Sequence, residues 1–163
     1  MSVNDCGLSH IALQVRDLAK SVAFYQRYAG MQVIHQREPG IAEAQKVAWL
    51  SDLTRPFALV LVQSHSTVDT PLGPFGHIGV ACASRDEIDE KVRLAEQEGV
   101  LRRAAQQSAA PVGYWAFFAD PDGNTLELSY GQQIGMDVIA AQRQAGDQAY
   151  SGVAHFLPGH VSR

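Results

Sequence analysis

Long apolar runs and blocks of positive charge are both missing from this sequence. No stretch of eighteen consecutive apolar residues occurs, and the polar start around Asp5 lacks the apolar segment of a secretory signal. We therefore expect a cytoplasmic protein with no membrane partner. Charged residues make up only 18% of the chain, the net charge is −4, and no basic run is longer than Arg102-Arg103. This balance argues against a nucleic-acid partner.

Cysteine is scarce, with Cys6 and Cys82 the two present. In a reducing compartment such a pair is expected to remain as free thiols rather than form a structural disulfide. At 163 residues, with 46% apolar residues, the chain has enough material for a core without covalent cross-links. It suits one domain or two small fused modules.

Two strand-like runs that begin with histidine, residues 10–15 and 77–82, dominate what is present. Because side chains alternate along a strand, each histidine shares a face with small or polar neighbours while Ile, Leu and Val occupy the other face. The run 125–130 follows the same pattern, with Glu127 between Thr125 and Ser129 and leucines behind. Two imidazoles and one carboxylate are thus predicted on the non-packing faces of three strands.

The order of elements repeats between the two halves. Helical spacing over 17–28 follows the first histidine strand, with Asp17 as N-cap and Gly30 as stop, and residues 84–95 follow the second, closed by Gly99. Further strands are predicted at 31–36, 47–50 and 57–63, then at 100–103, 114–119 and 125–130. Each half therefore has the pattern β-α-β-β-β. We predict a first module at 1–63, a linker rich in Pro and Gly at 64–76, a second module at 77–130 and an extension at 131–163 with a short helix at 136–143.

The segment 120–124, Asp-Pro-Asp-Gly-Asn, is typical of a tight turn, because proline presets φ and Gly or Asn accepts a positive φ. Three residues before Glu127, this turn fixes which face of the last strand the carboxylate occupies, since a slip of one residue would bury it.

Taken together, the segments 10–30, 76–100 and 114–130 resemble the vicinal oxygen chelate superfamily, which includes glyoxalase I, extradiol dioxygenases, fosfomycin-resistance transferases and bleomycin-resistance proteins. The resemblance spans roughly residues 7 to 131. It implies an α+β, glyoxalase-like fold in which tandem βαβββ modules form a curled mixed sheet, a partial barrel with helices outside. It also implies one divalent metal ion (Fe, Mn, Zn or Ni) per site, with His10, His77 and Glu127 as ligands. Such ligands leave about three positions of an octahedral ion open to a chelating substrate.

The duplication also locates a missing ligand. Position 60, equivalent to Glu127, holds a valine, where glyoxalase I and its relatives generally place Glu or Gln. The absence of a ligating side chain at position 60 argues against glyoxalase I itself as the activity of this chain. Extradiol dioxygenases use a His and a Tyr at two positions that are Gln63 and Phe117 in this chain. His65 and Tyr114 lie close to these positions in the sequence and are the catalytic candidates that remain. The fosfomycin-resistance pattern is absent at Ala12 and Met136.

For the substrate pocket we predict contributions from four residues: Gln14, Trp49, Val60 and Trp115. The resemblance implies a metal-dependent enzyme that acts on a small oxygenated organic substrate, aromatic compounds included, by dioxygenase-like or glyoxalase/lyase-like chemistry. The alternative is a non-catalytic drug-binding protein of the bleomycin-resistance type, although such proteins characteristically lack the ligand set retained here. A homodimer is also implied. Whether His10 meets His77 of its own chain or of a partner is left open by the sequence.

Overall fold

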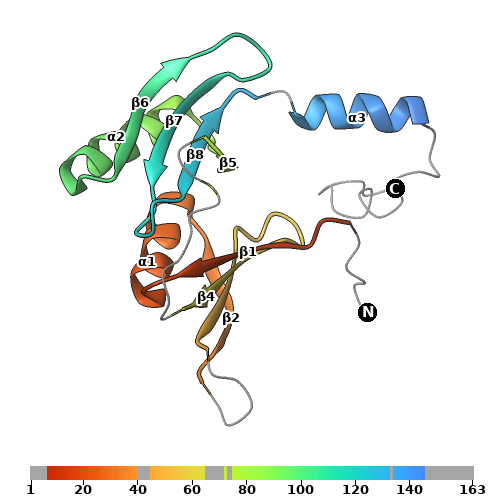
Figure 1. The fold of residues 1–163 in the computed structure, drawn as a ribbon. Helices are drawn as coiled ribbons and strands as arrows, with labels where there is room; N and C mark the ends of the chain where they lie inside the picture. Colours follow the sequence, from red (N-terminus) through yellow and green to blue (C-terminus); the bar gives the residue numbers. More distant parts are fainter. Residues whose placement is uncertain (1–6, 40–44, 65–71, 73–74, 133, 146–163) are drawn as a thin grey trace, which may run out of the picture.

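A computed structural model of the chain describes residues 7–39, 45–64, 72, 75–132 and 134–145 (Figure 1). The first half contains β1 (His10–Val15), α1 (Leu18–Ala29), β2 (Gln32–Arg37), β3 (Val47–Ser51) and β4 (Ala58–Gln63). The second half contains β5 (His77–Ala81), α2 (Arg85–Glu98), β6 (Leu101–Gln107), β7 (Tyr114–Ala119) and β8 (Thr125–Tyr130), and α3 (Ile134–Ala145) follows. The predicted element order is therefore present in both halves.

Both crossover helices begin and end at the residues that the capping pattern predicts. The Asp17 side chain accepts a hydrogen bond from the Lys20 backbone N–H, and Ser84 accepts one from Glu87 in the same way. Gly30 and Gly99 end the helices in the left-handed conformation, with φ of 64° and 69°. These caps satisfy backbone groups that have no partner within the helix.

Each half forms its own four-stranded sheet, with the strand orders β1-β4-β3-β2 and β5-β8-β7-β6. The histidine strands β1 and β5 lie at sheet edges and pair in parallel with β4 and β8. His10 lies opposite Ala58 and His77 lies opposite Thr125. Counting two residues onward along each partner strand gives Val60 and Glu127, so the register confirms that these two positions are equivalent. The predicted α+β, glyoxalase-like architecture is correct.

The two faces of each sheet have different roles. Alternate residues such as Leu59 and Leu61 on β4, and Leu126 and Leu128 on β8, belong to a single hydrophobic core that spans both halves. In the same core the ring of Tyr28 on α1 lies 5.5 Å from that of Phe118 on β7. The opposite faces carry the two histidines and Glu127. The core therefore joins the halves through their packing faces and leaves the other faces free.

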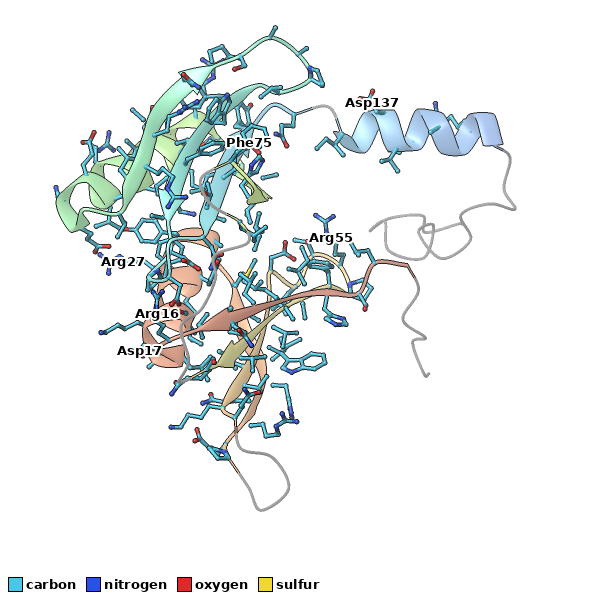
Figure 2. All side chains as sticks on the ribbon, in the orientation of Figure 1. Arg16, Asp17, Arg27, Arg55, Phe75 and Asp137 are labelled. Carbon is cyan, nitrogen blue, oxygen red and sulfur yellow. The ribbon has the colours of Figure 1, made fainter. Side chains whose placement is uncertain are left out.

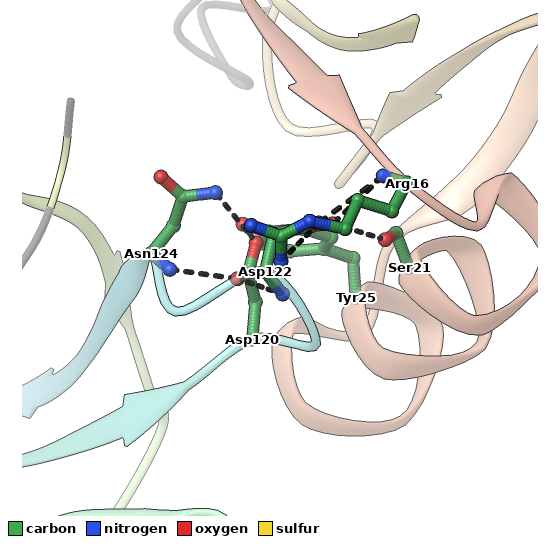
Figure 3. A network of polar contacts seen from close by, with 6 residues as sticks. All are labelled: Arg16, Ser21, Tyr25, Asp120, Asp122 and Asn124. Carbon is green, nitrogen blue, oxygen red and sulfur yellow. Dashed lines mark hydrogen bonds and ion pairs between the residues drawn. The ribbon is translucent and has the colours of Figure 1, made fainter. Parts of the chain in front are cut away.

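Polar contacts reinforce this junction at the turn between β7 and β8, which lies against α1 (Figure 3). The buried Tyr25 hydroxyl donates to Asp120 at 2.9 Å, and Ser21 Oγ donates to Asp122 at 3.4 Å. Asp122 also accepts the backbone N–H of Arg16 at 3.1 Å and forms an ion pair with its guanidinium at 3.4 Å. The predicted tight turn is present, with Gly123 at φ 88°. The carboxylates of Asp120 and Asp122 therefore connect the second half of the chain to the first by hydrogen bonds.

Beyond β8, α3 leads away from the two sheets in Figure 1 and exposes Ile134 and Val138. It is longer than the helix predicted at 136–143. Among the described residues, no helix has the length and apolar character needed to cross a membrane.

Candidate metal and substrate site

The site is built around His77 at the start of β5 and Glu127 in the middle of β8. Glu127 lies opposite Gly79, two residues along from His77, so both side chains are on the same face of the sheet. His77 Nε2 is 3.3 Å from Glu127 Oε2. The other ring nitrogen, His77 Nδ1, is 2.7 Å from the backbone carbonyl of Phe75. Because a carbonyl only accepts hydrogen bonds, Nδ1 carries a proton, and Nε2 is the ring nitrogen that faces the carboxylate.

Glu127 is nearly buried, at 7% exposure. Burial raises its pKa above the ordinary value, while the neighbouring His77 and a hydrogen bond from Gln132 act in the opposite direction. Gln132 Nε2 donates to Glu127 Oε1 at 3.1 Å. The carboxylate is thus oriented by one neutral donor, and its charge is only partly compensated within the described residues.

A cavity of about 690 Å³ opens over this pair. Phe117, opposite Glu127 in the sheet, places its ring 5.1 Å from the His77 ring. Trp115 lies 4.6 Å from Phe117 and is held by a hydrogen bond from its Nε1 to Ser108 Oγ. The cavity therefore has an aromatic floor beside two potential ligands.

His10 lies elsewhere, in a cavity of about 580 Å³ on the free face of the first sheet. Its Nδ1 is 2.9 Å from Ser9 Oγ, and its ring stacks on Trp49 with 6.1 Å between centroids. Arg55 lines the His10 cavity, whereas Phe75 lines the one at His77 and Glu127 (Figure 2). Within the described part of one chain, no three His, Cys, Asp or Glu side chains come close enough to hold a metal ion. One chain thus brings together two of the three predicted ligands.

The other predicted site residues are distributed between the two faces. Trp49 and Trp115 line the cavities of the first and second halves. Val60 and Gln14 lie on the face that carries His10 but line neither of these cavities; Val60 packs with Val47 and Ala58 in a small apolar cluster. Tyr114 points away from the cavity, because its hydroxyl donates to Asp89 on α2 at 2.5 Å. His65 lies outside the described residues.

Sequence reasoning overlooked the two arginines of the second cavity, Arg102 and Arg103. In a regular strand, two consecutive residues point to opposite faces. Here the pairing of β6 with β7 shifts register between Leu101 and Arg103, and again before Gln106, so both arginines reach the cavity. Their adjacency is visible in the sequence, but the bulge that turns them to one side is not.

Comparison with known proteins agrees with this fold. A model of the Glyoxalase/Bleomycin resistance protein/Dioxygenase superfamily matches residues 7–128. The chain belongs to this superfamily. An uncharacterized protein of Pseudomonas aeruginosa is 36% identical over 130 residues, which cover 78% of this chain and 91% of that protein. A lactoylglutathione lyase of Neisseria meningitidis is 31% identical over 137 residues, covering 83% and 97% of the two chains.

Among solved structures of the superfamily, glyoxalase I from Leishmania major superposes with a TM-score of 0.63 at 20% identity, covering 88% of this chain and 99% of its own. The fosfomycin resistance protein FosX from Listeria monocytogenes gives a TM-score of 0.61 at 22% identity, with 83% and 99% covered. At these identities the likeness concerns the fold. One fold can carry different activities, so this likeness does not by itself assign a reaction.

Proposed function

We propose that this protein is a divalent-metal-dependent enzyme that acts on a small oxygenated organic substrate, with lyase-like chemistry favoured over dioxygenase-like chemistry. The metal is held by His77 and Glu127 of one chain together with His10 of a second copy. The names of the lactoylglutathione lyase relatives support the lyase-like direction. Val60, which has no proton-accepting or ligating group, distinguishes the site from that of glyoxalase I itself.

The arrangement of His77 and Glu127 carries the proposal. His77 Nε2 and a Glu127 carboxylate oxygen, two atom types that bind divalent metals, converge to 3.3 Å, a separation at which a proton or a cation lies between them. The Phe75 carbonyl engages Nδ1 and leaves Nε2 as the nitrogen available to a metal, as carbonyl partners commonly do for metal-ligating histidines. A buried carboxylate with incomplete compensation is likewise suited to a cation. The residues present therefore fit a divalent metal ion.

The separation of His10 supports a site shared between two copies. The junction at Asp120 and Asp122 and the common core hold the two sheets by their packing faces, so the ligand-bearing faces of one chain do not close on each other. Both cavities are bordered by apolar side chains that a partner would cover. Exposed fractions are 51% for Ile34 and 60% for Leu53 in the first cavity, and 80% for Phe75 in the second.

When bound, the metal would supply Lewis-acid polarisation of substrate oxygens. Residues of the chain would form the surroundings of the metal and the substrate. Phe117 and Trp115 exclude water on one side, Gln132 orients Glu127 through its hydrogen bond, and the Phe75 carbonyl fixes the tautomer of His77.

The decisive test is complementation between two defective variants. His10→Ala and Glu127→Ala are produced with different tags, separately and together, and metal content is measured after loading with Mn²⁺ or Ni²⁺. We expect each variant alone to bind little metal. The purified mixed dimer should regain one complete site, because the intact His10 of one chain meets the intact His77 and Glu127 of the other in one of the two sites at the interface.

Wild-type protein and Glu90→Ala, a change of an exposed glutamate on α2, serve as controls with full metal content. A mixed dimer that binds no more metal than either parent would exclude the shared site. Equal and negligible metal in wild type and Glu127→Ala would refute the metal-dependent function altogether.

A further inference from the structure

Arg103 lies over the aromatic floor of the second cavity. Its guanidinium carbon is 5.6 Å from the centroid of the Trp115 ring and 5.8 Å from that of Phe117. Phe117 in turn contacts the His77 ring at 5.1 Å. Arg103 is therefore separated from the candidate metal ligands by a single aromatic ring, within the same cavity.

Stacking uses the flat face of a guanidinium and leaves its N–H donors, which lie in the plane, available to another group. In the described part of the chain Arg103 has no carboxylate partner, and its side chain is exposed to the cavity. Arg102 differs, because it donates to the Gly123 carbonyl at 2.8 Å and to Thr125 Oγ1. Arg103 thus lies over the two rings, and within the described residues none of its N–H donors has a carboxylate partner.

The charge of the cavity also differs from that of the whole protein. The residues that line the cavity include two guanidinium groups and one carboxylate, whereas the net charge of the complete chain is −4. A bound divalent cation would make this region more positive still. Such a cavity repels organic cations and attracts small anions.

We propose that Arg103 is the specificity-determining residue of this site and binds an anionic oxygen group, a carboxylate or a phosphonate, on a small organic substrate. A planar guanidinium matches either group with two parallel hydrogen bonds. The apolar remainder of the substrate would lie along Phe75 and Val112, which are 80% and 40% exposed at the cavity. This inference rests on the proposed function, because it assigns the substrate class of the same cavity.

Trp115 provides a direct readout. The sequence contains two tryptophans, so a Trp49→Phe background leaves Trp115, under Arg103, as the only indole reporter. Metal-free protein in this background is titrated with phenylacetate, its neutral isostere phenylacetamide, and phenylphosphonate, while indole fluorescence is recorded. We expect saturable changes with the anions and at least tenfold weaker binding of the amide. The stronger of the two anions identifies the oxygen group that the site prefers.

The Arg103→Gln variant should lose the preference for anions by at least tenfold, whereas Arg103→Lys should retain part of it. Arg93→Gln removes the same charge from an exposed position on α2 and should behave as the parent. Equal binding of amide and anion, or equal loss in Arg93→Gln and Arg103→Gln, would overturn the proposal. Because the titration uses metal-free protein, its failure would leave the result of the metal complementation test unaffected.

Discussion

At the scale of single residues, burial of the Glu127 carboxylate has a cost to folding, and the proposed metal site would give this side chain a function. Its carboxylate is almost buried, and burial raises its pKa. A group whose pKa is higher in the folded state favours folding when protonated, so its unfavourable contribution grows as the pH rises through that range. Its equivalent in the first half, Val60, is buried without this cost. Of these two equivalent positions, only the one in the second half carries a carboxylate that can bind a metal.

We predict that Glu127→Gln stabilises the metal-free protein at pH 7. The glutamine amide keeps an oxygen for the Gln132 donor and supplies an N–H to His77 Nε2, while the buried charge is removed. Thermal unfolding at pH 7 and pH 4 measures the effect, where 1 kcal/mol corresponds to about 2–4 °C in Tm for a chain of this size. The gain should shrink at the lower pH, and added metal should stabilise wild type alone. A lower Tm for the metal-free variant would contradict this account.

At the scale of elements, the crossover helices show how local chemistry sets helix ends. The start of α2 has two reciprocal contacts. Ser84 Oγ accepts from the Glu87 N–H at 3.2 Å, and the Glu87 carboxylate accepts from the Ala83 N–H at 3.0 Å. Lys91, one turn later, donates to the same carboxylate at 2.9 Å. The hydrogen bond with Lys91 is the main cause of the lowered pKa of Glu87.

We predict that Glu87→Gln destabilises the protein by about 0.5 kcal/mol at neutral pH, a small effect because the side chain is partly exposed. A lowered pKa in the folded state contributes stability above the unfolded value near 4.5, and this contribution is lost as the pH falls through the folded value. The free energies of unfolding of the two proteins in urea should therefore converge as the pH falls through the lowered pKa of Glu87. Glu90→Gln, an exposed change on the same helix, should show no such pH-dependent difference.

At the scale of the whole molecule, the junction between the halves is both apolar and polar. Tyr25 is fully buried, and its pKa is raised by burial and by the nearby Asp120 carboxylate, so the hydroxyl remains a donor. The Tyr25–Asp120 hydrogen bond joins residues 95 positions apart, and the contacts of Asp122 extend the same connection to Arg16 and Ser21. By fixing how the sheets meet, this junction determines that the ligand-bearing faces stay apart within one chain.

We predict that Tyr25→Phe destabilises the protein by about 1.5–3 kcal/mol, because it removes a buried hydrogen bond to a carboxylate and leaves Asp120 Oδ2 with only the Asn124 amide as donor among the described residues. Chemical denaturation gives the free energy of unfolding. The control is Tyr130→Phe, at a ring that is 40% exposed, where the change should stay within about 0.5 kcal/mol. Equal effects of the two substitutions would show that the Tyr25 hydroxyl does not stabilise the junction.

The sequence by itself determined the periodic features of this protein. The order of strands and helices, the caps at Asp17, Ser84, Gly30 and Gly99, the turn at 120–124 and the equivalence of Val60 with Glu127 all follow from short-range spacing. Such features depend on rotation per residue and on turn chemistry, both of which are local. The convergence of His77 with Glu127 on one face was also predictable, since parallel strands in register share that face.

Only the tertiary structure decided where His10 lies, which face of β7 lines the cavity, and how Arg103 comes to stand over Trp115 and Phe117. The place of His10 depends on how two sheets pack through a common core, and the place of Arg103 depends on a bulge between β6 and β7. Packing between distant segments and shifts of register arise from the balance of many contacts, which no local spacing encodes. For the same reason, the second role of the 120–124 turn, its carboxylates binding α1, became apparent only once the halves were seen together.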